Sequence, residues 1–274
     1  MALSFETPPE VSLLSILLKG GKGLREGETI PRIEATATRL VGSPDAYAKV
    51  CGSVEEVPIC WPAVLARSLQ LAVMTAPAFP FKLAGIVHTR QQITRVRAIG
   101  RDEPLAARCW VEGHRVVRSG GEFDLHTEVS SGGEVVWTGV TTILTKAVKG
   151  DGEKRPRPPE VPFRATRSVC WRLPADLGRR YAAVSGDYNP IHLSPWTSRP
   201  FGFRRPIVHG WWSLARMLAE LDTELPPACT VEVSFIKPVP LPGSVTFEAG
   251  PSADGLRFVL SRGEPCVVGV VREG

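Results

Sequence analysis

The sequence predicts an α+β protein built from two similar units, each a helix followed by strands. Three observations support this fold class. The length of 274 residues fits about two domains of ~150 residues each. Each half holds one conspicuous apolar helix with four candidate strands after it, and a six-residue segment recurs between the halves. With 43% hydrophobic and 22% charged residues, the composition excludes disordered, fibrous and membrane-embedded proteins.

The first half has its helix at residues 62–75. Pro62 stands at a plausible first helical position, and the segment is apolar nearly all round, which is typical of a buried helix. The strand candidates lie at residues 85–96, 106–117, 122–129 and 134–144. The last of these is rich in β-branched side chains, which favour a pleated sheet.

The second half repeats this order. Residues 211–221 place four large apolar side chains on one helical stripe, Trp211, Leu214, Leu218 and Leu221. The strand candidates lie at residues 229–236, 244–249, 256–261 and 266–271. Between the halves, residues 146–164 are rich in Pro, Gly and charge and have no apolar periodicity, which indicates an exposed connection. We therefore expect an N-terminal unit at 1–147, a linker at 148–163 and a C-terminal unit at 164–274.

The recurring segment reads YAKVCG at residues 47–52 and YAAVSG at residues 181–186, with four identities in six positions. Both copies lie upstream of the main helix of their half, so duplication explains the match better than chance. The copies then diverge, because Trp61 lies nine positions after Gly52, whereas Gly210 lies twenty-four positions after Gly186. The additional residues of the second copy hold the candidate chemistry.

The charge pattern argues against nucleic acid as a partner. There are 33 basic and 28 acidic residues, a net charge of +5, and the excess is spread over both halves without a basic tail. The six cysteines show no CxxC spacing, which favours reduced thiols in a cytoplasmic protein. The apolar run at residues 11–18 is preceded by Glu6 and Glu10 and is too short to span a bilayer. We therefore expect a soluble protein with no membrane segment.

The candidate chemistry lies in residues 181–210. A carboxylate, Asp187, and an imidazole, His192, are five residues apart in a context that favours a turn, so they could hold one water molecule between them. His209 follows, directly before the second apolar helix, whose first N–H groups could bind a developing oxyanion. On spacing alone, a turn with a surface histidine is the simpler interpretation. A metal site of Asp187, His192 and His209 is disfavoured because further ligands are missing.

The same segment resembles the hydratase 2 motif of MaoC-like (R)-specific enoyl-thioester hydratases and dehydratases. That motif reads S-G-D-x-N-P-[LI]-H after an aromatic residue and a short spacer, with Ala or Ser six residues after the His, and G-F-x-x-P-I-x-H-G follows downstream. The positions that fit are Tyr181, Ser185, Gly186, Asp187, Asn189, Pro190, Ile191, His192, Ser198, Gly202, Phe203, Pro206, Ile207, His209 and Gly210. The resemblance implies a double hot-dog fold, in which two central helices are each wrapped by an antiparallel sheet.

The resemblance also implies a lyase activity in fatty acid metabolism. Asp187 and His192 would hold the catalytic water, with Asp187 as the general base in hydration of a trans-2-enoyl thioester to the (3R)-hydroxyacyl thioester. The Gly210 N–H would bind the thioester carbonyl, and Ser185 and Asn189 would hold the loop. No metal or redox cofactor is required, because the thioester itself acidifies Cα. Coenzyme A (CoA) or an acyl-carrier protein would carry the acyl group.

The remaining candidate residues also fit simpler roles. Tyr181 fits core packing as well as function, and His209 fits a supporting role better than that of a base. Trp211 after His-Gly is larger than the usual family residue and could redirect the acyl pocket. Arg204 and Arg205 lie in a stretch without acids, which fits either a solvated loop or a site for CoA phosphates or an acidic carrier protein.

The first half lacks the equivalent chemistry. Ser53 stands where the second half has Asp187, and Cys60-Trp61 stands where it has His209-Gly210. We therefore expect a non-catalytic N-terminal unit that supplies the acyl pocket and a pseudo-dimer interface. Alternative functions are a thioester-binding scaffold subunit or, less favoured, a hot-dog thioesterase. A homodimer is possible.

Overall fold

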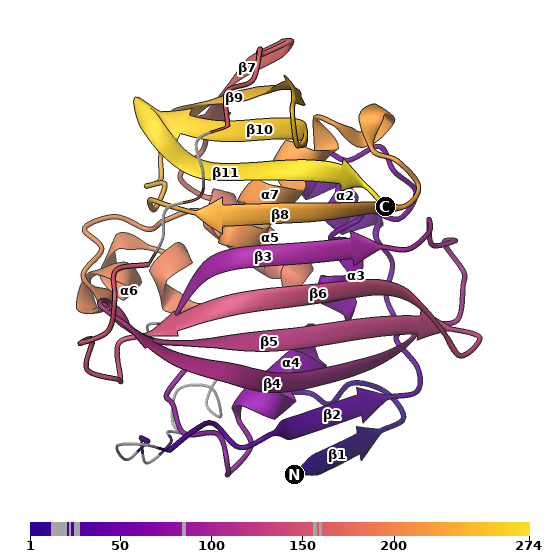
Figure 1. Ribbon diagram of the computed structural model, residues 1–274, viewed down its shortest axis with the longest axis vertical. Helices are drawn as coiled ribbons and strands as arrows, with labels where there is room; N and C mark the ends of the chain where they lie inside the picture. The colour runs from indigo at the N-terminus through magenta and orange to yellow at the C-terminus, as the bar shows by residue number, and fades with distance from the viewer. Residues whose placement is uncertain (12–20, 22, 25–27, 84–85, 156–157, 159–160) are drawn as a thin grey trace. The chain divides into compact units, whose positions relative to one another are not determined.

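The computed structural model describes residues 1–11, 21, 23–24, 28–83, 86–155, 158 and 161–274. The chain forms two compact units (Figure 1). The first comprises Met1–Gly42, Pro62–Ile93 and Asp102–Arg157, and the second comprises Ser43–Trp61, Thr94–Arg101 and Pro158–Gly274. Two segments of the N-terminal half therefore belong to the second unit. The predicted division of roles between 1–147 and 164–274 stays a prediction.

The first unit is an antiparallel sheet with one parallel edge pair. Its strands are β1 (Ala2–Phe5), β2 (Ile33–Ala37), β3 (Val87–Arg95, of which residues 87–93 belong here), β4 (Ala106–Val117), β5 (Gly120–Ser131) and β6 (Glu134–Thr145). Their order is β1-β2-β4-β5-β6-β3, with β1 and β2 parallel. Strand β2 pairs with β4, β4 with β5 and β5 with β6, all antiparallel.

A short helix covers one face of this sheet. Helix α4 (Arg67–Met74) follows α3 (Trp61–Leu65) and packs against β2 and β4. The apolar side chains of Leu69 and Val73 are fully buried. Gln70 is also buried, and its Nε2 donates to Thr127 Oγ1 on β5 at 2.9 Å, which satisfies the polar group inside the core.

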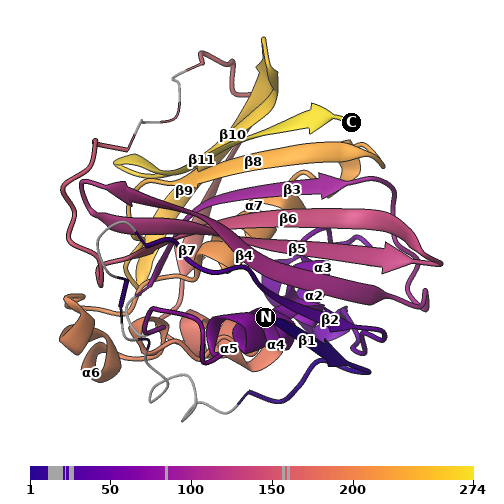
Figure 2. The ribbon, with the colours of Figure 1, turned by 60° about the horizontal axis from the view of Figure 1, so that its bottom comes forward.

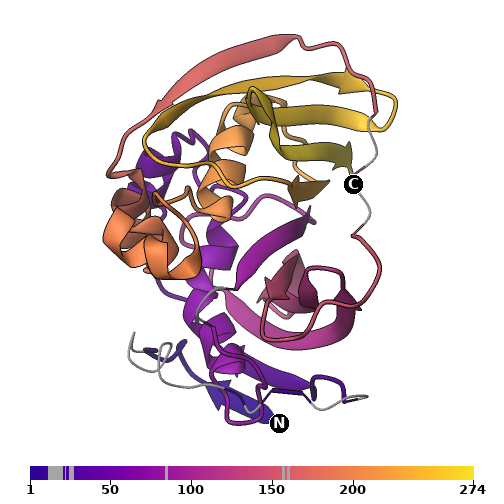
Figure 3. The same cartoon turned by 90° about the vertical axis from the view of Figure 1, so that its left-hand side faces the viewer.

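The second unit is a five-stranded antiparallel sheet. Its strands are β7 (Arg167–Leu173), β8 (Cys229–Phe235), β9 (Gly243–Ser252), β10 (Gly255–Arg262) and β11 (Glu264–Glu273), in the order β8-β11-β10-β9-β7. Its helices are α2 (Asp45–Cys51), α5 (Leu177–Ser185), α6 (Pro195–Ser198) and α7 (Gly210–Ala219), with short 3-10 turns η1 (Pro190–His192), η2 (Arg199–Phe201) and η3 (Asp222–Glu224). Figure 3 shows the sheet curving around α7.

Helix α7 is held in this curve by large side chains. Trp212 is 5% exposed and meets Trp171 of β7 edge to face, with ring centroids 6.4 Å apart. Trp171 in turn stacks on Phe247 of β9 at 5.2 Å. Met217 and Leu218 are buried further along the helix. Burial of such side chains is worth about 1.5–3 kcal/mol each, so packing fixes the helix on the sheet.

The two copies of the repeated hexapeptide form matching helix ends. Helix α2 ends at Gly52 with φ 75°, and α5 ends at Gly186 with φ 71°. Glycine adopts this left-handed cap without the steric cost of a Cβ atom. The helices pack together, and the rings of Tyr47 and Tyr181 lie 6.0 Å apart. The same conformation in both copies supports the predicted duplication.

Most elements predicted from the sequence are confirmed, with different ends. The helix expected over residues 62–75 is wrong as one piece, because it is interrupted at Ala66 between α3 and α4. Strands β1, β2 and β7 and helices α2 and α5 were not predicted. The connection at residues 146–164 has one isolated bridge, Phe163 to Ser252, in its described part. The apolar run at residues 11–18 lies, from residue 12 on, outside the described residues. Where the structure is described, no helix is both long and apolar enough to cross a bilayer.

Candidate active site

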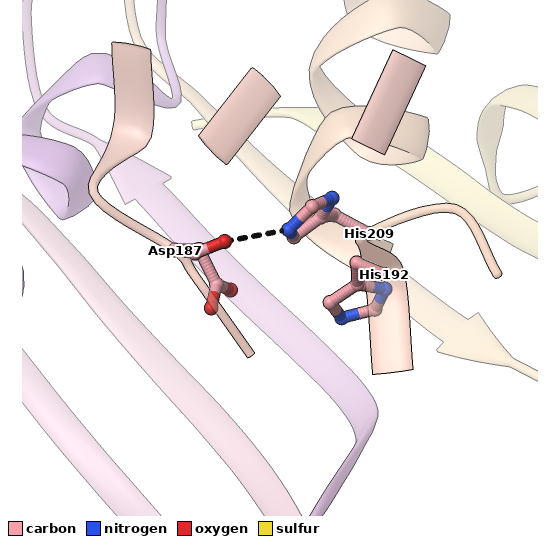
Figure 4. Close-up of side chains that lie close together, drawn as sticks. All are labelled: Asp187, His192 and His209. Atoms are coloured by element: carbon pink, nitrogen blue, oxygen red, sulfur yellow. Dashed lines mark hydrogen bonds between the residues drawn. The ribbon is translucent and has the colours of Figure 1, made fainter. Parts of the chain in front are cut away.

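Three candidate side chains of the second unit lie close together (Figure 4). Asp187 follows the end of α5, His192 is the last residue of η1, and His209 directly precedes α7. One oxygen of the carboxylate and one nitrogen of each ring all lie within 4.8 Å of one another. Asp187 is half-buried, and the two histidines are 8% and 2% exposed. The loop therefore brings one carboxylate and two imidazoles together, largely out of solvent.

The turn after α5 sets the position of Asp187. The Asp187 N–H donates to Ser185 Oγ at 3.2 Å, and the Asn189 N–H donates to Asp187 Oδ1 at 3.2 Å. The Ile191 N–H donates to Asn189 Oδ1 at 3.4 Å. Short polar side chains that accept hydrogen bonds from N–H groups two residues away stabilise turns in this manner. Ser185 and Asn189 thus hold the loop that carries the carboxylate.

The hydrogen bond of His192 selects its tautomer. His192 Nδ1 lies 2.7 Å from the carbonyl oxygen of Ile207. Because a carbonyl oxygen can only accept, Nδ1 carries the proton in this pair. Nε2 is then the basic nitrogen of the neutral ring.

His209 is fixed by a hydrogen bond and by two rings. Its Nε2 donates to the main-chain oxygen of Asp187 at 2.9 Å. Its ring stacks on His192, with centroids 3.7 Å apart and planes 27° apart, and lies 4.8 Å from the ring of Tyr181. Burial raises the pKa of Tyr181 well above its ordinary value, so the phenol stays neutral. His209 and Ser185 together hold the peptide groups on both sides of the Asp187 Cα.

The spacing of the cluster suits one shared water molecule. Hydrogen bonds to water oxygen are ~2.8 Å long, so atoms within 4.8 Å of each other can share one. Next to the cluster, α7 begins at Gly210, and the first N–H groups of a helix have no partner within the helix. These donors and the positive end of the helix dipole suit an oxygen that gains negative charge. The arrangement can therefore activate a water beside a site for an oxyanion.

Comparisons with known proteins bear directly on this site. The family described as "MaoC like domain" matches residues 153–256, which include the whole cluster. The 3-hydroxyacyl-thioester dehydratase X of Mycobacterium tuberculosis is 34% identical over 233 residues, which are 83% of this chain and 83% of the relative. The chain belongs to the MaoC-like dehydratase family.

Other members agree with this membership. An (R)-specific enoyl-CoA hydratase of Aeromonas caviae is 36% identical over 72 residues, which are 25% of this chain and 54% of that protein. The crystal structure of HtdX from M. tuberculosis matches with a TM-score of 0.76 and 32% identity, over 88% of this chain and all of that one. A MaoC-like dehydratase from Phytophthora capsici, at 18% identity and a TM-score of 0.66, shares the fold. The predicted α+β double hot-dog fold is confirmed.

The other predicted residues of this MaoC-like chain lie outside the cluster. Arg204 and Arg205 are exposed, in the loop between η2 and Ile207. Trp211 is half-exposed in the first turn of α7. Its neighbour Trp212 is buried, and its Nε1 donates to the carbonyl of Val50 on α2 at 3.1 Å. Trp212 therefore anchors the start of α7.

The sequence does not indicate which main-chain carbonyl groups hold the side chains of the site. The carbonyls of Ile207 and Asp187 fix the two imidazoles, and the carbonyl of Val50 fixes the start of α7. Every residue has a carbonyl, so no side-chain pattern marks these three. The motif did indicate the region, because Ile207 lies two residues before His209 within it.

Proposed function

We propose that this chain catalyses the reversible hydration of trans-2-enoyl thioesters to (3R)-hydroxyacyl thioesters, or the reverse dehydration. The observation that carries the proposal is the cluster of Asp187, His192 and His209 within 4.8 Å, beside the first turn of α7. Two similar proteins support it by their names, a 3-hydroxyacyl-thioester dehydratase and an (R)-specific enoyl-CoA hydratase.

In hydration, the Asp187 carboxylate and His192 Nε2 hold the water. As Asp187 removes a proton, the water oxygen bonds to Cβ, and the electron pair of the Cα=Cβ bond moves toward the thioester carbonyl. The Gly210 N–H stabilises the resulting enolate oxygen. The proton that Asp187 took from the water is then delivered to Cα, which returns the carboxylate to its ionised form, so the elements of one water molecule have been added across the double bond. Dehydration follows the same steps in reverse.

The proposed reaction uses no redox cofactor and no metal. The thioester carbonyl acidifies Cα, so proton transfer by the side chains is sufficient. Each histidine already donates one ring N–H to a main-chain carbonyl, and the two rings are stacked. A bound metal would have to use the nitrogens needed for the water. We expect chelator-treated protein to keep its activity, and loss of activity restored by a divalent metal would contradict this mechanism.

The decisive experiment is hydration of short-, medium- and long-chain trans-2-enoyl-CoA by the purified protein. The absorbance of the conjugated enoyl thioester should fall, and chiral analysis should show the (3R) product. An (S) product or no turnover of any chain length would contradict the proposal. Binding of acyl-CoA without turnover would favour a scaffold subunit, and free thiol released from a saturated acyl-CoA would favour a thioesterase.

A further inference from the structure

The loop between the two parts of the site is built differently from its counterpart in the first copy. We call residues 188–205 the recognition segment. The second copy has twenty-three residues between Gly186 and Gly210, whereas the first has eight between Gly52 and Trp61. From residue 188 to residue 219 there is no Asp or Glu. Only the copy with the carboxylate and imidazole pair therefore carries this long basic insertion.

The recognition segment is rigidly connected to the loop that holds His192. Ser194 and Thr197 form a capping box around α6. Thr197 Oγ1 donates to the carbonyl of Pro190 at 2.7 Å, two residues before His192. Ser198 Oγ donates to the carbonyl of Phe203 at 3.1 Å, which closes the following turn. The insertion therefore has a defined shape.

This rigid segment exposes an aromatic ring and three positive charges. Trp196 on α6 is 79% exposed, and the guanidinium of Arg199 lies 5.3 Å from its ring centroid. Figure 2 shows this short helix, labelled α6. Arg204 and Arg205 are exposed too, and none of the three arginines forms a salt bridge within the described part of the chain. The segment therefore offers an aromatic face and several positive charges to a partner in solution.

We propose that the recognition segment binds the nucleotide end of a CoA thioester. The adenine would stack on the face of Trp196 that Arg199 leaves open, and Arg199, Arg204 and Arg205 would pair with the phosphates. This inference rests on the proposed function, because it names the carrier of the acyl group. It explains why a stretch without acids adjoins the site.

The chemistry of the segment fits a nucleotide closely. Every nucleobase has a π face, and its stacking on an exposed aromatic side chain is favourable without sequence-specific contacts. Arginine pairs with phosphate through two parallel N–H donors. Stacking and phosphate pairing are provided together within ten residues, from Trp196 to Arg205. An acidic carrier protein would use the charges but would not require the stacking face.

The test compares two substrates that share the reacting end, crotonyl-CoA and crotonyl-pantetheine, which lacks the nucleotide. We expect the triple variant R199A/R204A/R205A to lower the ratio of their kcat/KM values about tenfold, mainly through KM for the CoA thioester. The effect should shrink at high salt, because exposed charges are screened. Trp196→Ala should lower the same ratio, and Trp196→Phe, which keeps an aromatic face, should restore most of it. Arg262→Ala, an exposed arginine on β10, is the matched control.

Direct binding provides a second readout, which requires no turnover. Adenosine 3′,5′-bisphosphate should bind the wild-type protein, by calorimetry, more tightly than it binds Trp196→Ala or the triple variant. If the variants reduce turnover of both thioesters equally, or change neither, the proposal is overturned. Selective loss of turnover for a carrier-protein thioester would overturn it in favour of a protein partner. If the wild type hydrates neither thioester, the proposed function fails, while bisphosphate binding still decides the nucleotide site.

Discussion

The two copies of the hexapeptide are followed by turns of the same local structure, but the side chains in these turns contact different groups. Helices α2 and α5 both finish on a left-handed glycine, and a polar side chain follows each one, Ser53 and Asp187. In both loops that side chain accepts a hydrogen bond from the N–H two residues later. Glu55 N–H to Ser53 Oγ measures 3.3 Å, and Asn189 N–H to Asp187 Oδ1 measures 3.2 Å. The turn is therefore common to both copies and cannot by itself produce activity.

The difference lies in what occupies the space beyond the turn. In the second copy the Asp187 carboxylate meets two imidazoles. In the first copy Ser53 Oγ donates to Asp222 Oδ2 at 2.7 Å, and the Val54 N–H donates to the same oxygen at 2.7 Å. Asp222 begins η3, so this carboxylate attaches the first loop to the segment that directly follows α7. The first loop is thus tied down by a carboxylate, whereas the second brings its own carboxylate to the two imidazoles of the candidate site.

The largest expected effect is loss of the presented carboxylate. Asp187→Asn keeps an oxygen that can accept from Asn189 but loses the proposed general base. We expect kcat for enoyl-CoA hydration to fall at least ~10²-fold, typical for a positioned acid–base group. Stopped-flow or steady-state absorbance of the enoyl thioester measures it.

The matched control is Asp176→Asn, which changes the residue before α5 and leaves the cluster intact. Its kcat should stay near the wild-type value, and thermal denaturation should show both variants folded. If a folded Asp187→Asn protein kept the wild-type kcat, Asp187 would not take part in the reaction. The proposed functional difference between the two loops would then be wrong.

The next effect concerns His209, which we propose as a positioning residue. His209→Leu removes the donor to the Asp187 carbonyl and the ring that stacks on His192. We expect kcat to fall roughly 10- to 100-fold with a smaller change in KM, because the carboxylate is misplaced rather than the substrate released. His209→Gln can donate from its own amide nitrogen and should recover part of kcat. Equal losses for Leu and Gln would show that the hydrogen bond to Asp187 is not what matters.

Local features of the sequence predicted much of this site. The five-residue spacing of Asp187 and His192 among turn-forming residues is a short-range pattern, and the structure places both in the connection that runs from the end of α5 through η1. The stripe that predicted α7 is equally local. By contrast, Ser53 and Asp222 are 169 positions apart, and nothing near either one indicates the other.

The missed elements have similar physical causes. Strand β1 has only four residues and pairs at the sheet edge, so its short apolar pattern carries little signal. Ala66 is a good helix former, yet it separates α3 from α4, so tertiary packing decides against local propensity there. Family resemblance supplied the sheet that wraps each helix, which periodicity alone left undetermined.

A stability effect should separate the supporting loop from the reactive one. Asp222→Ala leaves the Ser53 hydroxyl and the Val54 N–H without their carboxylate, which should lower the free energy of unfolding by about 1–3 kcal/mol. Ser53→Asp should also destabilise the protein, because a second carboxylate would face Asp222. Ser53→Asn, uncharged and of similar size, is its control. Denaturant unfolding measures all three, and unchanged stability in Asp222→Ala would remove the supporting role from the first loop.

We expect the smallest effect when the residues that precede Gly186 and Gly52 are exchanged. Ser185 Oγ accepts the Asp187 N–H at 3.2 Å, and the equivalent residue of the first copy is Cys51. Sulfur is a weaker acceptor than a hydroxyl oxygen, so Ser185→Cys should lower kcat only about threefold, the equivalent of part of one hydrogen bond. Burial raises the pKa of the native Cys51 thiol to about 12, so that thiol stays protonated at neutral pH and acts as packing. Cys51→Ser should therefore leave kcat unchanged and alter only stability. If Cys51→Ser changed kcat as much as Ser185→Cys does, the first loop would be coupled to the chemistry as closely as the second.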